Sequence, residues 1–258
     1  MQTIDVARAD GIVTITLDAP AKKNAISALM WDELYATLRE VQPSSTDRVV
    51  VITGAGGEFC SGADLWDRGG EARHTHQLSS MRAITEVALA LARLPQPTIA
   101  KVRGVAVGAG CNLALGCDLV VAGETARFSE IFTRRGLSLD FGGSWILPRR
   151  VGLHRAKELA FFADIIDAAE ADRIGLVNRV VPDAELDEFV DAWARRLAAL
   201  PPIALAQNKR MLNNSMSLSL EQALEDEGAA QTVNFGTRDT VEAISSFVDK
   251  REPTYEGR

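Results

Sequence analysis

The chain has 258 residues, of which 47% are hydrophobic and 24% charged, as in a globular protein with one large core. Its net charge of -7 argues against nucleic-acid binding through a basic face. No apolar run approaches the roughly 20 residues of a membrane-spanning helix, and the first residues do not resemble a secretory signal. We therefore expect a cytoplasmic protein that binds neither nucleic acid nor membranes.

Strands and helices alternate in the first two thirds of the chain. Residues 3–6 and 12–17 predict a hairpin, because both are β-branched and Ala-Asp-Gly between them is a turn signal. A helix is expected over 28–41 with Ser27 as its N-cap. The continuous apolar run at 48–54 is typical of a buried strand. Further elements are expected as a helix over 78–94, a strand over 97–107, a helix end followed by a strand over 114–123, and a short strand over 126–129.

From about residue 184 the pattern changes to helices alone, over 184–200, 203–215, 218–235 and 238–251. No long Pro/Gly/Ser linker precedes them. We therefore predict a mixed α/β core at 1–183 and a docked helical subdomain at 184–258.

Cysteine and histidine usage gives no sign of a metal site. Three cysteines, Cys60, Cys111 and Cys117, stand in apolar contexts that favour reduced, buried thiols over disulfides. His74 and His76 lack further ligands at metal-binding spacing, so a surface loop is the better interpretation and no metal is expected.

The glycine-rich turns argue against a dinucleotide-binding site and against a serine-hydrolase site, but they allow an oxyanion hole. The run after residue 54 has Phe59 where a dinucleotide fingerprint needs its third glycine, and residues 142–146 lack the final glycine of a serine-hydrolase elbow. The turns at 61–65 and 108–115 can aim unpaired N–H groups at one carbonyl oxygen, as in an oxyanion hole. They can equally be tight turns with close packing.

Asp140 is a carboxylate among Gly, Leu, Ser, Phe and Trp residues, in GLSLDFGGSW (136–145). Burial of an ionised carboxylate costs several kcal/mol unless it is paired. The residue can be a helix N-cap or a turn aspartate that accepts from the N–H groups of the following Gly-Gly-Ser-Trp, or it can be functional. Its apolar neighbours should in either case raise its pKa by desolvation.

Five segments in order along the chain carry recognisable motifs. They are AKKNAIS (21–27), ITGAGGEFCSGADL (52–65), VRGVAVGAGCNLALGCDLVVAGETARFS (102–129), GLSLDFGGSWILPRRVG (136–152) and FVDKREP (247–253). Together they resemble the crotonase superfamily, also called the enoyl-CoA hydratase/isomerase family. The resemblance implies a spiral of repeated strand–strand–helix units with a C-terminal helical trimerisation region. It also implies an acyl-CoA substrate, a homotrimer or dimer of trimers, no metal, and no cofactor beyond the coenzyme A of the substrate.

The resemblance also assigns site residues. The backbone N–H groups of Ala63 and Ala109 would form the oxyanion hole. Trp66 stands where relatives often carry a lysine near the CoA phosphates, so phosphate pairing falls to Arg68 or Lys250. Without the resemblance, the lysines would be read as surface charges. The remaining substrate contacts that it implies are Lys22, Lys23, Asn24, Ala25, Asp64, Leu65, Phe132, and, from a neighbouring subunit, Phe247 and Lys250.

Both glutamates of the family's hydratases are missing from their motif positions, which hold Asn112 and Phe132. Glu130 lies two residues from the second position, a shift of about 7 Å along a strand. Asp140 matches the aspartate that isomerases of ring epoxides and some enoyl-CoA isomerases use as an acid/base; a related dehalogenase uses it as a nucleophile. We therefore predict an isomerase. The alternatives are a hydratase that uses Glu130 and a non-catalytic acyl-CoA binder.

The acyl group is not identified by the sequence. Residues 67–77 are polar and predict a lid over the acyl site. Large apolar side chains that can line a pocket, or simply belong to the core, are Trp66, Leu78, Met81, Phe132, Phe141 and Trp145.

Overall fold

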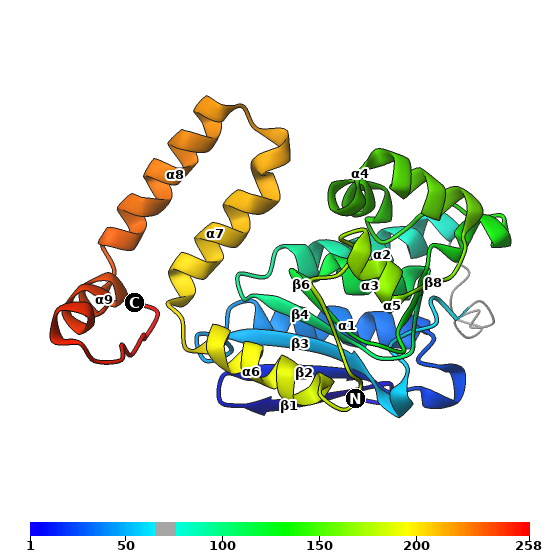
Figure 1. The fold of residues 1–258 in the computed structure, drawn as a ribbon, viewed down its shortest axis with the longest axis horizontal. Helices are drawn as coiled ribbons and strands as arrows, with labels where there is room; N and C mark the ends of the chain where they lie inside the picture. Colours follow the sequence, from blue (N-terminus) through cyan, green and yellow to red (C-terminus); the bar gives the residue numbers. More distant parts are fainter. Residues whose placement is uncertain (65–75) are drawn as a thin grey trace.

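The computed structural model describes residues 1–64 and 76–258, and shows two sheets with helices packed around them (Figure 1). The larger sheet contains β1 (Ile4–Ala9), β2 (Ile12–Leu17), β3 (Val49–Gly54), β4 (Thr98–Val102), β6 (Leu119–Gly123) and β9 (Arg179–Val181), hydrogen-bonded in that order. The smaller sheet contains β5 (Val105–Val107), β7 (Arg127–Ser129) and β8 (Ile166–Asp167).

Helices connect and cover these strands. The α-helices are α1 (Ala28–Val41), α2 (Gln77–Ala92), α3 (Ala109–Gly116), α4 (Gly143–Phe162), α5 (Ala168–Arg173), α6 (Leu186–Ala198), α7 (Pro202–Asn214), α8 (Leu220–Phe235) and α9 (Arg238–Asp249). Short 3-10 helices are η1 (Pro20–Lys22), η2 (Ala55–Gly57), η3 (Ile131–Arg135) and η4 (Ser215–Ser217).

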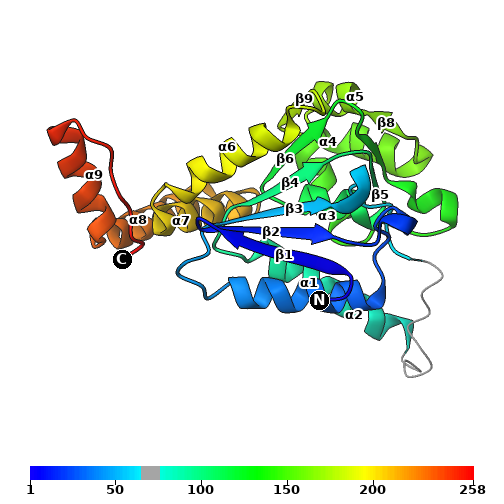
Figure 2. The same cartoon turned by 90° about the horizontal axis from the view of Figure 1, so that it is seen from below.

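The larger sheet follows from local sequence. The predicted hairpin is confirmed as the antiparallel pair β1–β2, whose turn places Asp10 and Gly11 at φ 52 and 77. Parallel pairing then joins β2 to β3, β3 to β4, β4 to β6 and β6 to β9 (Figure 2). The β3 run is buried on both faces: Val50 and Ile52 belong to the main core, whereas Val49 and Val51 belong to the core under α6. This two-sided burial explains the run's continuous apolar sequence.

The strand expected over 97–107 is confirmed as two strands, β4 and β5, which belong to different sheets. The division occurs at Gly104, whose φ of 56 is a left-handed conformation that favours glycine. A Cβ at this position would also lie 2.6 Å from the carbonyl oxygen of Gly57. The turn therefore moves the chain from the larger sheet to the smaller one, beside the segment that leads into α3.

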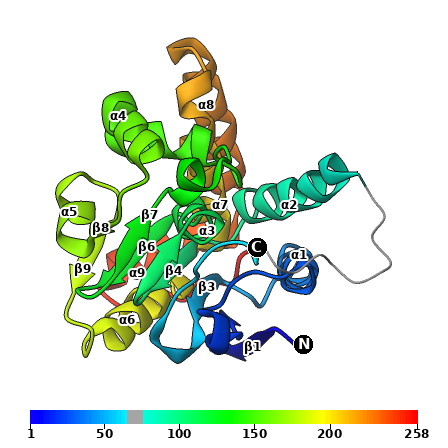
Figure 3. The ribbon, with the colours of Figure 1, turned by 90° about the vertical axis from the view of Figure 1, so that its right-hand side faces the viewer.

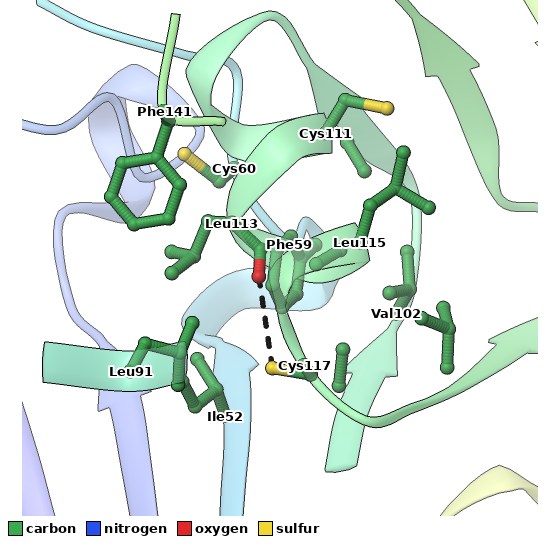
Figure 4. Close-up of a cluster of buried hydrophobic side chains, with 14 of the residues drawn as sticks. Ile52, Phe59, Cys60, Leu91, Val102, Cys111, Leu113, Leu115, Cys117 and Phe141 are labelled. Carbon is green, nitrogen blue, oxygen red and sulfur yellow. Dashed lines mark hydrogen bonds between the residues drawn. The ribbon is translucent and has the colours of Figure 1, made fainter. Parts of the chain in front are cut away.

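The core around α3 contains all three cysteines as free thiols (Figure 4). The thiol of Cys117 donates to the Leu113 carbonyl oxygen at 3.6 Å. Burial raises the pKa of Cys60 and of Cys117 to about 12, so both stay protonated and unreactive at neutral pH. The prediction of reduced, buried thiols is confirmed.

The C-terminal helices do not all leave the sheet. Helix α6 covers one face of the larger sheet through Leu186, Val190 and Ala194, opposite the face that carries α3 (Figure 3). Helices α7, α8 and α9 extend from the α/β part of the chain, and α9 lies at the end of the molecule remote from α4 (Figures 1 and 2). The subdomain boundary at residue 184 stays a prediction. In the structure, the chain leaves the sheet only after α6.

The packing of α3 gives a direct test of the fold. A Cβ at Gly110 would lie 2.5 Å from the carbonyl oxygen of Cys60 and 2.7 Å from its Cβ, so Gly110→Ala forces the two segments apart. We expect it to lower the free energy of unfolding by about 1–3 kcal/mol, as overpacking does. In the matched control, Gly228→Ala on α8, the new Cβ meets nothing within 4 Å. That change should be neutral or slightly stabilising.

Urea unfolding of both variants measures the difference. If Gly110→Ala were as stable as Gly228→Ala, the close approach of α3 to Cys60 would be disproved.

Candidate active site

The loop that carries Asp140 has a constrained backbone. Phe141 and Gly142 both have left-handed φ values, 47 and 84, ahead of α4. A non-glycine residue rarely adopts this conformation and needs support from its surroundings. The ring of Phe141 stacks on Trp31 of α1, with centroids 5.2 Å apart, and the Gly143 N–H donates to the Asp140 carbonyl oxygen at 2.9 Å. These contacts fix the backbone at Asp140.

The carboxylate of Asp140 lies in an apolar setting. Its Oδ1 atom is buried and has no hydrogen-bond partner within residues 1–64 and 76–258. Burial raises the pKa of Asp140 from 3.8 to about 6, as the apolar sequence predicted. The alternative that Asp140 caps α4 is wrong: the N-cap is Gly142, and no side chain caps the helix. Its carboxylate is thus left without the structural role that the sequence offered.

Two backbone turns meet beside α3, as the predicted oxyanion hole requires. Cys60 bridges to Ala106, and the turn that follows holds Gly62 at φ 102. A Cβ built on Gly62 would lie 2.9 Å from the Val107 carbonyl oxygen and 3.8 Å from the Ala109 nitrogen. Only glycine permits this approach, which places Ala63 next to the start of α3.

The first N–H groups of α3 are available to a ligand. Ala109 is the first residue of this helix, so its N–H has no acceptor within the helix. Ala63 is exposed in the adjoining turn, where Ile26 donates to the Gly62 carbonyl oxygen at 2.8 Å. That the two amides together form an oxyanion hole stays a prediction.

A buried polar cluster joins α3 to the Asp140 loop. Asn112 is fully buried on α3, and its Nδ2 atom donates to the Asp140 carbonyl oxygen at 3.0 Å and to Glu130 Oε2 at 3.3 Å. Gly143 makes room for it, because a Cβ there would lie 2.5 Å from Asn112 Nδ2. Sequence spacing did not predict that Glu130 belongs to this cluster.

Glu130 is an acid without a cationic partner among the described residues. It is only 2% exposed, and burial raises its pKa to about 7. Hydrogen bonding to Cys111 and Asn112 acts to lower this pKa, whereas the charge of Asp140 acts to raise it. Its Oε1 atom is unpartnered in the described parts of the chain. A void of about 10 Å³, barely enough for one water, lies beside it and is lined largely by Cys111, Phe128, Leu147, Leu159, Ile166 and Leu176.

Phe132, at the second hydratase position, is a buried aromatic residue in η3. It is 6% exposed, and its Cζ atom lies 3.7 Å from the position that a Cβ on Gly108 would take. The ring therefore packs beside the residue that precedes Ala109. A side chain that cannot transfer a proton stands close to the predicted oxyanion hole.

The predicted coenzyme A segment is held by ion pairs and by Asn24. Lys22 Nζ lies 2.6 Å from Asp64 Oδ2, and Lys23 Nζ lies 2.8 Å from Glu58 Oε1. Both lysine side chains are more than half exposed and remain accessible to a ligand phosphate. Ala25 is partly exposed beside them.

Asn24 has a different role from the one predicted. The residue is fully buried, its Oδ1 accepts from the Ala19 N–H at 3.0 Å, and its Nδ2 donates to the carbonyl oxygens of Ala55 and Glu58. Its side-chain amide is therefore fully used in holding loops together. We reassign Asn24 from ligand contact to loop support.

The other predicted substrate contacts are not brought to Asp140 within one chain. Phe247 is 86% exposed on α9, and Lys250 follows it at the end of that helix. Helix α9 itself lies at the opposite end of the molecule from α4 (Figure 1). The predicted contact of Phe247 and Lys250 with the coenzyme A of a neighbouring subunit stays a prediction. Leu65, Trp66, Arg68, His74 and most of the lid predicted at 67–77 lie outside the described residues.

The apolar residues that can line a pocket differ in how exposed they are. Phe141 is buried, whereas Leu78 and Trp145 are about half exposed. The Arg149 guanidinium covers the Trp145 ring at 4.0 Å from its centroid. Within the described residues, no cluster of three or more His, Cys, Asp or Glu side chains can hold a metal, and no helix is long and apolar enough to cross a membrane.

Comparison with known proteins identifies the class. Residues 7–258 match the family model for enoyl-CoA hydratase/isomerase. The chain is 40% identical to a probable enoyl-CoA hydratase of Rhodobacter capsulatus, over 99% of this chain and 98% of that protein. It is 36% identical to 1,2-epoxyphenylacetyl-CoA isomerase of Escherichia coli, over 96% of each. The crystal structure of an enoyl-CoA hydratase from Bacillus anthracis superposes with a TM-score of 0.94 at 35% identity, covering all of both chains.

The chain therefore belongs to the enoyl-CoA hydratase/isomerase family, and the expected crotonase-like α/β fold is confirmed. Relatives named as a hydratase and as an isomerase are similarly close. Family membership thus leaves the reaction to be inferred from this chain's own residues.

The charge state of Glu130 gives a prediction about stability. Burial raises its pKa from 4.5 to about 7, so between these pH values the native state keeps a proton that the unfolded chain has released. Wild-type stability must then fall as pH rises through this window, by about 3 kcal/mol at 1.36 kcal/mol per unit. Glu130→Gln removes the titration and should gain about that much relative to wild type between pH 5 and pH 8.

Urea unfolding at the two pH values measures this gain. A difference between wild type and Glu130→Gln that is independent of pH would show that Glu130 is not a buried neutral acid.

Proposed function

We propose that this protein is a CoA-thioester isomerase that moves a double bond or opens a ring epoxide. In this proposal Asp140 is the acid/base, and the backbone amides of Ala63 and Ala109 form the oxyanion hole. The observation that carries the proposal is the Asp140 carboxylate, which has no structural hydrogen bond among the described residues and a pKa raised to about 6. A base with this pKa is still ionised at neutral pH and is stronger than an ordinary aspartate.

The chemistry for a 3-enoyl-CoA substrate needs a single carboxylate. Asp140 removes a proton from the α-carbon, and the electron pair moves onto the thioester oxygen to give a dienolate. The amides of Ala63 and Ala109 stabilise this oxyanion. The protonated Asp140 then delivers the proton to the γ-carbon, and the double bond forms between the α- and β-carbons. Atoms and charge balance without water, metal or redox cofactor.

The first alternative is a hydratase that uses Glu130. Hydration in this family recruits two glutamates, and here Asn112 and Phe132 stand at their motif positions. Glu130 is close to Asn112, but it is 2% exposed and surrounded largely by apolar side chains. A water molecule that attacks a substrate needs access to its base. The enclosure of Glu130 disfavours this alternative.

The second alternative is a protein that binds acyl-CoA without turning it over. Tight binding of acyl-CoA without product formation would support it. Against it stands the raised pKa of Asp140, because a desolvated carboxylate without a hydrogen-bond partner costs stability and is typical of functional sites.

The proposal predicts which reaction the wild type catalyses and that Asp140→Asn loses it. Wild type should convert 3-enoyl-CoA to 2-enoyl-CoA, or isomerise a ring-epoxide thioester, with little hydration of crotonyl-CoA. Asp140→Asn keeps the size of the side chain but cannot accept the proton, so kcat should fall by about 10²- to 10⁴-fold. Chromatography of the thioester products measures both reactions.

Acyl-CoA binding to Asp140→Asn, measured by calorimetry, is the control and should stay within a few-fold of wild type. Efficient hydration of crotonyl-CoA by both proteins would rule the proposal out.

A further inference from the structure

The Asp140 carboxylate is held only through its own backbone. No described residue forms a hydrogen bond to Oδ1, and burial alone accounts for the raised pKa. The backbone carbonyl oxygen, in contrast, accepts two hydrogen bonds, from Gly143 N–H at 2.9 Å and from Asn112 Nδ2 at 3.0 Å. Because a carboxylate must be placed accurately to transfer a proton, the groups that hold this carbonyl oxygen determine where the carboxylate points.

Asn112 can hold the carbonyl oxygen in only one orientation. A carbonyl oxygen accepts hydrogen bonds but cannot donate them, so the amide nitrogen of Asn112, and not its oxygen, must face Asp140. The second N–H of the same nitrogen then points to Glu130 Oε2 at 3.3 Å. The fully buried amide has no solvent to replace either partner.

Glu130 lies where it can secure that orientation. Its chain position is directly after β7, at the start of η3, and its side chain reaches the cluster from a different element than Asp140 does. Cys111, the neighbour of Asn112 on α3, lines the same small void as Glu130. Glu130 therefore connects the β7–η3 junction to Asn112 on α3, and Asn112 connects α3 to the Asp140 loop.

We propose that Asn112 is a positioning residue for Asp140, and that Glu130 is a positioning residue that acts through Asn112. Glu130 serves as a hydrogen-bond acceptor for the Asn112 amide and does not transfer protons in the reaction. This inference rests on the proposed role of Asp140. It gives a function to Asn112 at a position where hydratases of the family carry a catalytic glutamate.

Three variants test the chain of contacts. Asn112→Leu removes both hydrogen bonds, and Glu130→Leu removes the acceptor for Asn112; each should lower kcat of the isomerisation by about 10- to 100-fold, as a displacement of about 1 Å does. The KM for the acyl-CoA should stay within about threefold in both. Glu130→Gln keeps an acceptor oxygen of the same size, so it should retain kcat within about threefold of wild type.

Ser129→Ala is the matched control for the loss of a buried hydrogen bond. The Ser129 hydroxyl is buried next to Glu130 in sequence, but it donates to the Ala163 carbonyl oxygen, beyond the far end of α4. This variant should leave kcat unchanged. Circular dichroism and thermal melts of all variants establish that the proteins compared are folded.

The outcomes separate this inference from the proposed function. If Asp140→Asn were fully active, the role of Asp140 itself would fail. If Asp140→Asn were inactive while Asn112→Leu and Glu130→Leu kept wild-type kcat, only the positioning inference would fail. A loss in Glu130→Gln as large as that in Glu130→Leu would show that Glu130 transfers a proton, and would also overturn it. A drop in kcat for Ser129→Ala equal to that for Asn112→Leu would reduce the effect to general loss of packing and contradict the inference as well.

Discussion

Glycines at positions 62 and 110 allow the turn after Cys60 and the first turn of α3 to approach more closely than any side chain permits. A Cβ at either position would meet backbone atoms at 2.5–2.9 Å. This contact brings the turn that carries Ala63 next to the start of α3, and it places α3 so that Asn112 points toward the Asp140 loop. The proposed oxyanion hole and the proposed base thus depend on the same packing of α3. A small outward movement of this helix would separate both from a bound thioester.

Two desolvated carboxyl groups stand near this helix without a cation among the described residues. Desolvation raises the pKa of Asp140 to about 6 and that of Glu130 to about 7. The difference in their surroundings separates their functions. Asp140 is only partly buried, whereas Glu130 is enclosed and contacts Asn112. At neutral pH Asp140 is therefore mostly ionised, as a base must be, while Glu130 is partly protonated.

Local signals predicted much of the fold. The β1–β2 hairpin, the strand at 49–54 and the Ser27 N-cap, whose Oγ accepts from the Met30 N–H at 3.1 Å, all follow from neighbouring residues. The change of sheet between β4 and β5 was not predicted, because it depends on the backbone at Gly104 and its contact with Gly57. Helix α4 was not predicted, since Pro148 and the non-helical Gly152 interrupt its pattern.

Local sequence also predicted part of the site, whereas contacts between distant residues were missed. The apolar neighbours of Asp140 were visible in the sequence, and its raised pKa followed from them. Glu130 was judged by its position along a strand, but the chain turns into η3 immediately after Ser129, and the side chain meets Asn112, 18 residues away. Contacts of this kind depend on how elements pack. The buried role of Asn24 was hidden likewise, because two of its three partners, Ala55 and Glu58, lie in the turn after β3, 31 and 34 residues along the chain.

Exchange of α-protons in heavy water tests the central claim most directly, because it follows proton removal at the α-carbon independently of any later step. Wild type incubated with a saturated acyl-CoA in heavy water should incorporate deuterium at the α-carbon, as followed by proton NMR. Asp140→Asn should bind the thioester but exchange its α-protons at least about 100-fold more slowly. Exchange at the wild-type rate in Asp140→Asn would contradict the assignment of Asp140 as the base.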